Sequence, residues 1–223
     1  MATEKYKIYE FSKEKLTHLP KVVFVYGEDE AQRFVVKEVL KGKYRKINPD
    51  TPLNERILLV EDKKSKLSFP DIQDMCFYNP LFDVKKIIYI EDFRKLKALK
   101  KTKIEKFLVE DEYDNTLVLD AYEKSLPKEV KFLEDYETDF MVIECKKPQF
   151  NYGEHNKIVS CLCESVLGFK PQTDFVQYIA KASNLNYMGI KNDLFFLDLI
   201  FDGELDRENL TPSLYQESIS KNI

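Results

Sequence analysis

The sequence contains very little histidine. Only His18 and His155 occur among its 223 residues. Histidine is the side chain most often used as a general base near neutral pH. Its scarcity argues against most hydrolase mechanisms, and no Ser/His/Asp or Cys/His arrangement stands out. We therefore predict neither a catalytic residue nor a cofactor.

Cysteine is also scarce, and nothing in its placement requires a disulfide framework in a chain of this length. The four cysteines are Cys76, Cys145, Cys161 and Cys163. Cys161 and Cys163 stand two residues apart in a segment of helical period, which turns the two thiols to nearly opposite sides. This spacing does not match the usual zinc sites, so core or surface cysteines are favoured over metal ligands.

The sequence lacks an excess of positive charge and any long apolar run. Charged residues make up 33% of the chain and the formal net charge is −4, which argues against a globally basic nucleic-acid-binding protein. No apolar run approaches the roughly 18 residues that a membrane span needs, and the first residues form no apolar signal core. We expect a soluble, cytoplasmic protein.

What the sequence does contain is an alternation of short apolar runs and helical patterns. The runs predict five strands, at residues 22–26, 57–60, 87–90, 117–119 and 140–143. The first helical pattern between them is predicted to end at Gly42. Continuous apolar strands separated by helices are typical of a mostly parallel sheet covered on both faces.

The pattern changes near residue 147, where the strands stop. Helical segments follow at roughly 154–167, 173–183 and 190–202. We predict an α/β domain over residues 1–147 and a small all-helical domain over residues 148–223.

The turn after the first strand is where nucleotide-binding α/β proteins place their phosphate loop. The Walker A pattern, G-x-x-x-x-G-K-[ST], needs a second glycine, a lysine and a hydroxyl group. After Gly27, those positions hold Gln32, Arg33 and Phe34. Residues 28–30 also put three carboxylates where a phosphate would lie. We predict a nucleotide-binding topology that does not bind nucleotide.

Leu81 and Phe82 form a second feature of interest. Asn79 and Pro80 end the preceding helix, because a residue before proline is pushed towards an extended conformation. The two apolar side chains therefore lie in a connection, ahead of the strand at residues 87–90. They either tuck under the edge of the sheet or form an exposed apolar tip for a partner, and the pattern alone leaves both alternatives open.

Several segments together resemble the delta subunit of the bacterial DNA polymerase III clamp loader. Residues 21–30 resemble that family's first strand and Gly-Glu turn, and residues 79–90 resemble its Leu-Phe pair, basic residues and apolar strand. Further similar segments are residues 93–97, 115–119 and 140–145. The resemblance covers about residues 6–145 and is weak from residue 148 onward.

This resemblance implies an AAA+-like (P-loop NTPase-type) first domain that lacks Walker A and ATPase activity, followed by a helical domain. Family members bind the ring-shaped sliding clamp (beta) and hold one interface open. They do so in a loader with ATPase subunits (tau or gamma) and delta prime, which acts on primed DNA. The family's Leu-Phe pair enters an apolar pocket on the clamp, so the resemblance implies clamp binding by Pro80, Leu81 and Phe82.

The sequence departs from the family at two places. Members often carry a glutamine shortly before the Leu-Phe pair, and Phe77 stands near that place here. Full-length members also have a third helical domain, the collar, whereas this chain reaches Ile223 soon after the second domain. We expect the collar to be absent or truncated.

Residues 85–106 carry a local excess of positive charge, with nine basic and three acidic residues. A solvated helix face is one interpretation of this stretch, and a surface for DNA phosphates or an acidic partner is the other. The residues of this candidate patch are Lys95, Lys97, Lys100 and Lys101.

Three functions therefore follow from the sequence. The first is a non-catalytic clamp-loader delta subunit that binds and opens the sliding clamp during DNA replication. The second is a degenerate P-loop nucleotide-binding enzyme, and the third is an α/β scaffold with an unrelated protein partner.

Overall fold

The computed structural model describes residues 4–47, 54–59, 68–77, 86–95, 101–109, 115–128, 130–131, 140–149 and 151–220. The chain folds as two compact units. One comprises Met1–Glu28 with Leu40–Cys145, and the other comprises Asp29–Val39 with Lys146–Ile223.

The first unit is built on a six-stranded sheet in the order β1-β6-β2-β5-β4-β3. The strands are β1 (Glu4–Lys7), β2 (Val22–Tyr26), β3 (Asn54–Leu59), β4 (Lys86–Glu91), β5 (Thr116–Ala121) and β6 (Phe140–Glu144). All neighbouring pairs are parallel. Phe24 at the centre lies opposite Leu119 on one side and Val142 on the other. The predicted parallel sheet is therefore confirmed.

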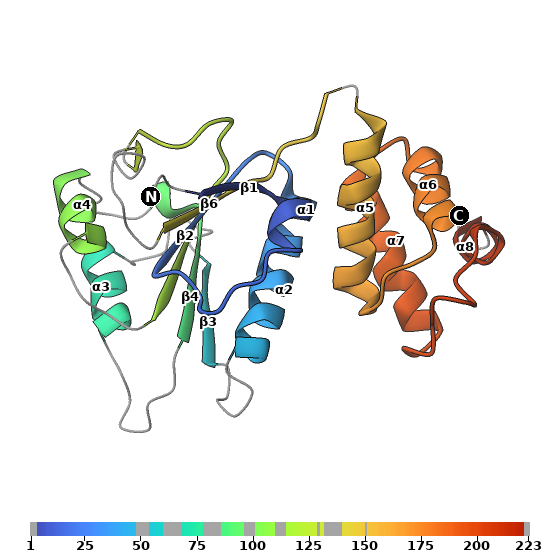
Figure 1. Ribbon diagram of the computed structural model, residues 1–223, viewed down its shortest axis with the longest axis horizontal. Coiled ribbons are helices and arrows are strands. Elements are labelled where there is room, and N and C mark those ends of the chain that lie inside the picture. Colours follow the sequence, from blue (N-terminus) through green and yellow to red (C-terminus); the bar gives the residue numbers. More distant parts are fainter. Residues whose placement is uncertain are drawn as a thin grey trace. The chain divides into compact units, whose positions relative to one another are not determined.

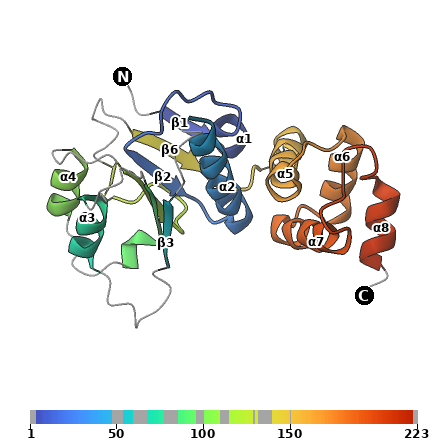
Figure 2. The same cartoon turned by 90° about the horizontal axis from the view of Figure 1, so that it is seen from below.

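Helices cover both faces of this sheet. The elements are α1 (Ile8–Phe11), α2 (Glu30–Ile47), α3 (Phe69–Phe77), the 3-10 turn η1 (Phe93–Lys95) and α4 (Lys101–Val109). Helices α3 and α4 lie on one side of the sheet, and α1 and the part of α2 that belongs to this unit lie on the other (Figures 1 and 2). Parallel strands buried on both faces explain why the apolar runs are continuous rather than alternating.

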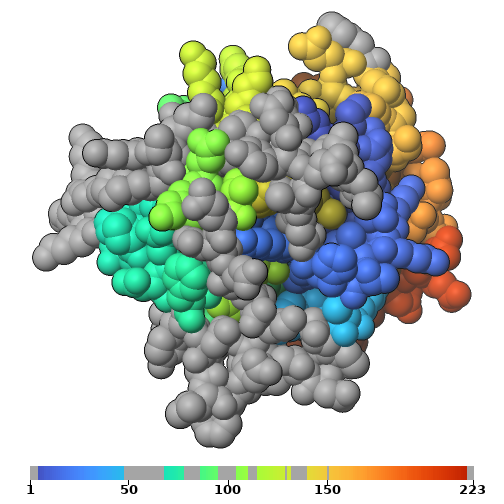
Figure 3. Space-filling view, turned by 60° about the vertical axis from the view of Figure 1, so that its left-hand side comes forward, coloured from blue at the N-terminus to red at the C-terminus, as the bar shows by residue number. Residues whose placement is uncertain are grey.

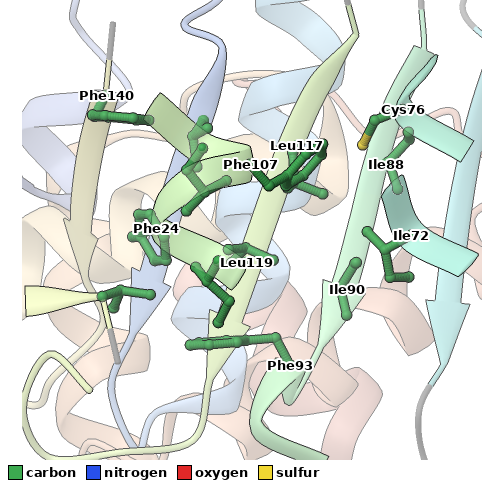
Figure 4. Packing of buried hydrophobic residues seen from close by; sticks show 14 of the residues in the cluster. Phe24, Ile72, Cys76, Ile88, Ile90, Phe93, Phe107, Leu117, Leu119 and Phe140 are labelled. Atoms are coloured by element: carbon green, nitrogen blue, oxygen red, sulfur yellow. The ribbon is translucent and has the colours of Figure 1, made fainter. Parts of the chain in front are cut away.

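An apolar core lies between the sheet and helices α3 and α4. Cys76 lies beside Ile88 and Ile72 beside Ile90, and all four side chains are fully buried (Figure 4). Phe107 of α4 closes the layer against α3, edge-on to Phe69 with ring centroids 5.5 Å apart. Each fully buried side chain of this size stabilises the fold by about 1.5–3 kcal/mol.

The second unit holds four helices besides the first part of α2. They are α5 (Tyr152–Leu167), α6 (Thr173–Ala182), α7 (Tyr187–Ile200) and α8 (Pro212–Ser220). The Asn151 side chain caps α5 by accepting from Glu154 N, at 3.2 Å, and Gly168 ends that helix with φ of 77°. The buried Tyr187 hydroxyl shares a hydrogen bond with His155 Nδ1, and burial lowers the pKa of His155.

The structure corrects the expected end of the first helix and adds elements that the pattern did not predict. Helix α2 continues past Gly42 to Ile47, so this glycine lies inside the helix. Strand β1, helix α1 and helix α8 are additions.

All four cysteines are buried free thiols. Burial raises the pKa of Cys76 to about 12 and also raises the pKa of Cys163. Over the described part of the chain, no group of three His, Cys, Asp or Glu side chains is arranged to hold a metal ion. Nor do these residues include a helix long and apolar enough to cross a membrane.

Candidate functional site

The chain passes very close to its neighbours where the phosphate loop would begin. Gly27 N donates to Ala121 O of β5 at 3.3 Å, and Cys145 N donates to Tyr26 O at 2.7 Å. Gly27 has φ of 141°, and a Cβ atom there would lie 2.0 Å from the Cys145 carbonyl oxygen. Only glycine fits, because the space that a side chain needs is filled by backbone.

The turn that follows is too short to wrap a phosphate group. Strand β2 ends at Tyr26 and helix α2 begins at Glu30, which leaves only residues 27–29 between them. In a Walker A loop the four variable residues after the first glycine stay outside the helix and turn their amides towards the phosphates. Here only Glu28 and Asp29 of those four positions stay outside the helix, and Glu30 and Ala31 already lie in the first turn of α2.

The amides at the start of α2 bind a carboxylate of the chain itself. The Asp29 side chain, 7% exposed, accepts from Gln32 N at 2.9 Å and so caps the helix. The Gln32 side chain is buried as well and donates from Nε2 to Lys146 O at 3.0 Å. A helix N-terminus is the feature that holds phosphate in nucleotide-binding folds, and here Asp29 occupies it.

The carboxyl groups of Asp29 and Glu28 also oppose the approach of a negatively charged phosphate. Burial raises the pKa of Asp29, while the Gln32 amide and the charge of Lys147 act against that rise. Glu28, the neighbouring acid, is exposed and lies 3.8 Å from Lys124. A phosphate at this position would have to displace one carboxylate and approach another.

The other candidate region begins at helix α3, which forms a continuous part of the surface (Figure 3). Ser68 precedes the helix, and both its amide and its hydroxyl donate to the Asp71 carboxylate, at 2.6 and 2.7 Å. The Asp71 carboxylate thus reaches back to the residue before the helix, as the N3 side chain of a capping box does, and this contact fixes where the helix starts. Phe69, Ile72 and Cys76 bury one face of the helix.

Phe77, the last residue of α3, is exposed at 48%. Its ring contacts Phe107 edge-on, with centroids 5.9 Å apart. The position where the resembled family often has glutamine therefore holds an aromatic side chain that presents apolar surface. Pro80, Leu81 and Phe82 lie outside the described residues, so the choice between a buried pair and an exposed tip stays a prediction.

The candidate basic patch is only partly covered by the structure. Lys97 and Lys100 lie outside the described residues. Lys95 ends η1 and Lys101 begins α4, and their side chains are outside the description. The patch therefore also stays a prediction.

Sequence reasoning missed Asn115, which is buried directly before β5. Its Nδ2 donates to Cys76 O at 2.7 Å, and its Oδ1 accepts from Lys86 N at 2.9 Å. The only available signal was a polar residue directly before a buried apolar run. Its two partners lie 39 and 29 residues away in the chain and leave no mark in the local pattern.

The structure is similar to that of the DNA clamp loader delta protein of Bacillus subtilis. The TM-score is 0.50 and the identity 15%, over 92% of this chain and 58% of that one. The fold is that of the AAA+ proteins.

Two proteins of Thermotoga maritima are also similar. The Holliday junction branch migration motor RuvB has a TM-score of 0.46 and 13% identity, over 90% of this chain and 61% of its own. Domain III of the replication initiation protein DnaA has a TM-score of 0.46 and 12% identity, over 96% of this chain and 88% of its own. The chain thus spans about three fifths of the length of the delta and RuvB structures. The sequence matches no protein-family model and no curated protein.

The turn at residues 27–29 lies where proteins of this fold bind nucleotide phosphates. Gly27 follows β2, the strand in the middle of the sheet between β6 and β5, where such folds bind the nucleotide phosphates. The groups directly at the turn include a buried carboxylate and the Cys145 backbone oxygen, which accept hydrogen bonds and do not bind anions, and the charges of Lys147 and Arg33 act on that carboxylate.

Proposed function

We propose that the chain is a non-catalytic clamp-loader subunit of the delta type, which binds the sliding clamp and holds it open. The observation that carries this proposal is an AAA+ fold whose phosphate position is closed by Asp29 and Gly27. A fold alone does not define an activity. A fold of this type that has lost its phosphate loop is suited to binding and positioning partners rather than to hydrolysis.

The proposed clamp site is centred on Pro80, Leu81 and Phe82. Burial of Leu81 and Phe82 in a partner pocket stabilises a complex by about 1.5–3 kcal/mol for each side chain. Together they supply about millimolar affinity or somewhat tighter, so additional surface is needed for tight binding. The exposed ring of Phe77 at the end of α3 supplies such a surface.

The proposed partners follow from the same role. They are the sliding clamp, the ATPase subunits of the loader and delta prime, with primed DNA reached through the complex. We assign Lys95, Lys97, Lys100 and Lys101 to contact with DNA or with an acidic partner surface.

A binding assay between the purified chain and the sliding clamp of the same organism tests the proposal. Leu81→Ala with Phe82→Ala is expected to weaken clamp binding by about 100-fold or more, because about 3 kcal/mol or more of apolar burial is lost. Leu199→Ala with Ile200→Ala is the matched control, because these two exposed apolar residues lie in the helical unit. Equal binding by the tip variant and the wild-type chain would exclude the assigned site.

Calorimetry with Mg-ATP separates this proposal from the enzyme alternative. We expect no saturable heat, because Asp29 occupies the helix amides that a phosphate would need. Saturable ATP binding that Asp29→Ala strengthens would instead favour a degenerate P-loop enzyme.

A further inference from the structure

Helix α7 of the helical unit is apolar on both of its sides. It packs against α5 and α8, and its buried side chains follow one side of the helix. These are Tyr187, Ile190, Leu194 and Leu197. At about 100° per residue, the opposite side carries Asn192 and four apolar residues. We call these four the outer face of α7; they are Phe195, Phe196, Leu199 and Ile200.

The outer face of α7 is largely open to solvent. Leu199 is 76% exposed, Ile200 45% and Phe195 43%, and Phe196 is partly exposed. A helix at a protein surface normally turns polar residues outward. Single exposed apolar residues are ordinary, whereas a contiguous group of them on one helix marks an interaction site.

The spacing of these side chains fits a second helix. Phe195 and Leu199 form one row of residues four apart, and Phe196 and Ile200 form the neighbouring row. Two helices pack by placing the side-chain rows of one between the rows of the other. The outer face of α7 therefore has the pattern that a partner helix with its own apolar stripe requires.

The N-terminal end of the first row is held in place by α2. The Phe195 ring lies edge-on to Phe34, with centroids 5.5 Å apart, and Lys191 Nζ lies 5.1 Å from the centroid of Phe34. Phe34 belongs to the part of α2 that lies in the helical unit. These contacts fix the Phe195 ring in advance, so less conformational freedom is lost when a partner binds.

The C-terminal end of the outer face is acidic. Residues 192–206 include five acidic residues and no basic one. Two of the acids accept hydrogen bonds within the unit, Asp193 from the Tyr215 hydroxyl and Asp206 from Asn209 N. The other three, which we call the acidic end, are Asp198, Asp202 and Glu204. Together with the carbonyl end of the helix dipole, they attract Lys and Arg and repel nucleic acid and anionic membranes.

We propose that the outer face of α7 binds a helix of another protein, one with an apolar stripe flanked by Lys or Arg residues that meet the acidic end. The apolar rows supply the affinity, and the acidic end selects a basic partner and sets its direction. This surface shares no residue with the proposed clamp site, so it goes beyond the proposed function.

Two synthetic peptides of about 18 residues test the proposal by fluorescence anisotropy with the full chain. Both carry the same leucine stripe along one side of a helix, flanked by lysines in one peptide and by glutamates in the other. We expect the lysine peptide to bind at least about tenfold more tightly, with a preference that shrinks as salt is added. Equal binding of the two peptides, or no binding of the lysine peptide, overturns the proposal.

Leu199→Gln with Ile200→Gln tests the apolar part of the surface. Both side chains are exposed, and glutamine is a good helix former, so urea unfolding should be unchanged. This variant should bind the lysine peptide at least about tenfold more weakly. Tyr152→Gln is the matched control, because Tyr152 is equally exposed on α5 of the same unit, and it should bind within about twofold of wild type. Equal weakening by both variants contradicts the assigned site.

Charge reversal tests the acidic end. Asp198→Lys with Glu204→Lys leaves Asp202 in place, because its φ of 49° is a conformation that aspartate tolerates. This variant should prefer the glutamate peptide by about tenfold, since the complementary charges are exchanged. An unchanged preference for the lysine peptide means that the acidic end does not select the partner.

A second copy of the chain is the alternative occupant of the outer face. Lys191 is the only basic residue of α7, and it is held over the ring of Phe34, so one copy offers little positive charge to another. We expect no dimer that depends on this face. Dimerisation in sedimentation experiments that Leu199→Gln with Ile200→Gln abolishes would assign the face to a second copy and overturn the basic partner.

Discussion

Gly27 and Asp29 together close the position where an AAA+ protein would bind the phosphates of its nucleotide. Because Gly27 has no side chain, the backbone after β2 can pass close to Cys145, whose carbonyl oxygen fills the space that a Cβ atom would need. Asp29 then satisfies the first amides of α2 from within the chain. The two effects are independent. The close approach at Gly27 is steric, whereas Asp29 acts through a hydrogen bond and its negative charge.

Substitution of Gly27 by alanine tests the close approach at this residue, and substitution of Gly42 by alanine is the control. Gly27→Ala should lower the free energy of unfolding by about 3 kcal/mol or more, because the new Cβ meets the Cys145 backbone at a positive φ. Gly42→Ala should raise it by about 0.5–1 kcal/mol, because nothing lies within 4 Å and the site is inside α2. Urea unfolding measures both. A Gly27→Ala chain as stable as wild type would show that β2 does not pass so near Cys145.

Single residues also show how far sequence reasoning reaches. The loss of the phosphate loop was readable, because Gln32, Arg33 and Phe34 replace residue types that the chemistry requires. The cap by Asp29 and the bridge by Asn115 were not. Both depend on which backbone groups are left without partners, and that is known only once the helices and strands are in place.

Helix α3 is the element on which the proposed clamp site depends most. Its N-terminus is fixed by the hydrogen bonds from Ser68 to the Asp71 carboxylate, and its C-terminus by Asn115. Its buried face packs on β4, where Ile72 lies beside Ile90 and Cys76 beside Ile88. The helix is thus held at both ends and along one side, which makes it a rigid base for the segment that follows.

The cap at Asp71 gives α3 a predictable response to acid. Hydrogen bonds from the hydroxyl and amide of Ser68 lower the pKa of Asp71. Its contribution to stability is therefore complete above the ordinary carboxyl pKa and is lost as the pH falls through the lowered value. Asp71→Ala should speed amide hydrogen exchange in the first turns of α3 at neutral pH, and the difference from wild type should vanish in strong acid. Asp74→Asn, an exposed acid further along the helix, is the control.

If Asp71→Ala and Asp74→Asn changed exchange in α3 equally, the effect would come from net charge and not from the cap. That result would contradict the geometry at Ser68.

Strand β1 and the later end of helix α2 were missed for two different physical reasons. Strand β1, Glu4–Lys7, is short and rich in charge, and it pairs only with β6 at the edge of the sheet. An edge strand has no need for the continuous apolar run that marked the central strands. Helix α2 runs through Gly42 because a glycine costs a helix only about 1 kcal/mol, which packing of the flanking turns outweighs.

At the scale of the whole molecule, more of the fold than of the candidate site could be predicted from the sequence. The parallel sheet and the later helices followed from apolar periodicity, which reflects burial and is repeated over many residues. The clamp site depends on two apolar side chains in one connection, where no periodicity distinguishes a buried pair from an exposed tip. The basic stretch has the same limit, because charge shows what a surface attracts but not which partner it meets.

The division of the chain into two units bears on how the proposed function is tested. The proposed clamp site belongs to the sheet unit, and α5–α8 belong to the helical unit. Substitutions at exposed apolar residues of the helical unit, such as Leu199, are therefore expected to leave clamp affinity unchanged. A large loss of affinity there would mean that the clamp surface extends beyond the first unit.

The most direct test of the central claim is isothermal titration of the full chain with the sliding clamp of the same organism, in the absence of any nucleotide. A clamp-binding AAA+ fold with a closed phosphate position should bind without ATP, and Leu81→Ala with Phe82→Ala should remove that binding. No binding by the wild-type chain, or binding only when Mg-ATP is present, would contradict the account.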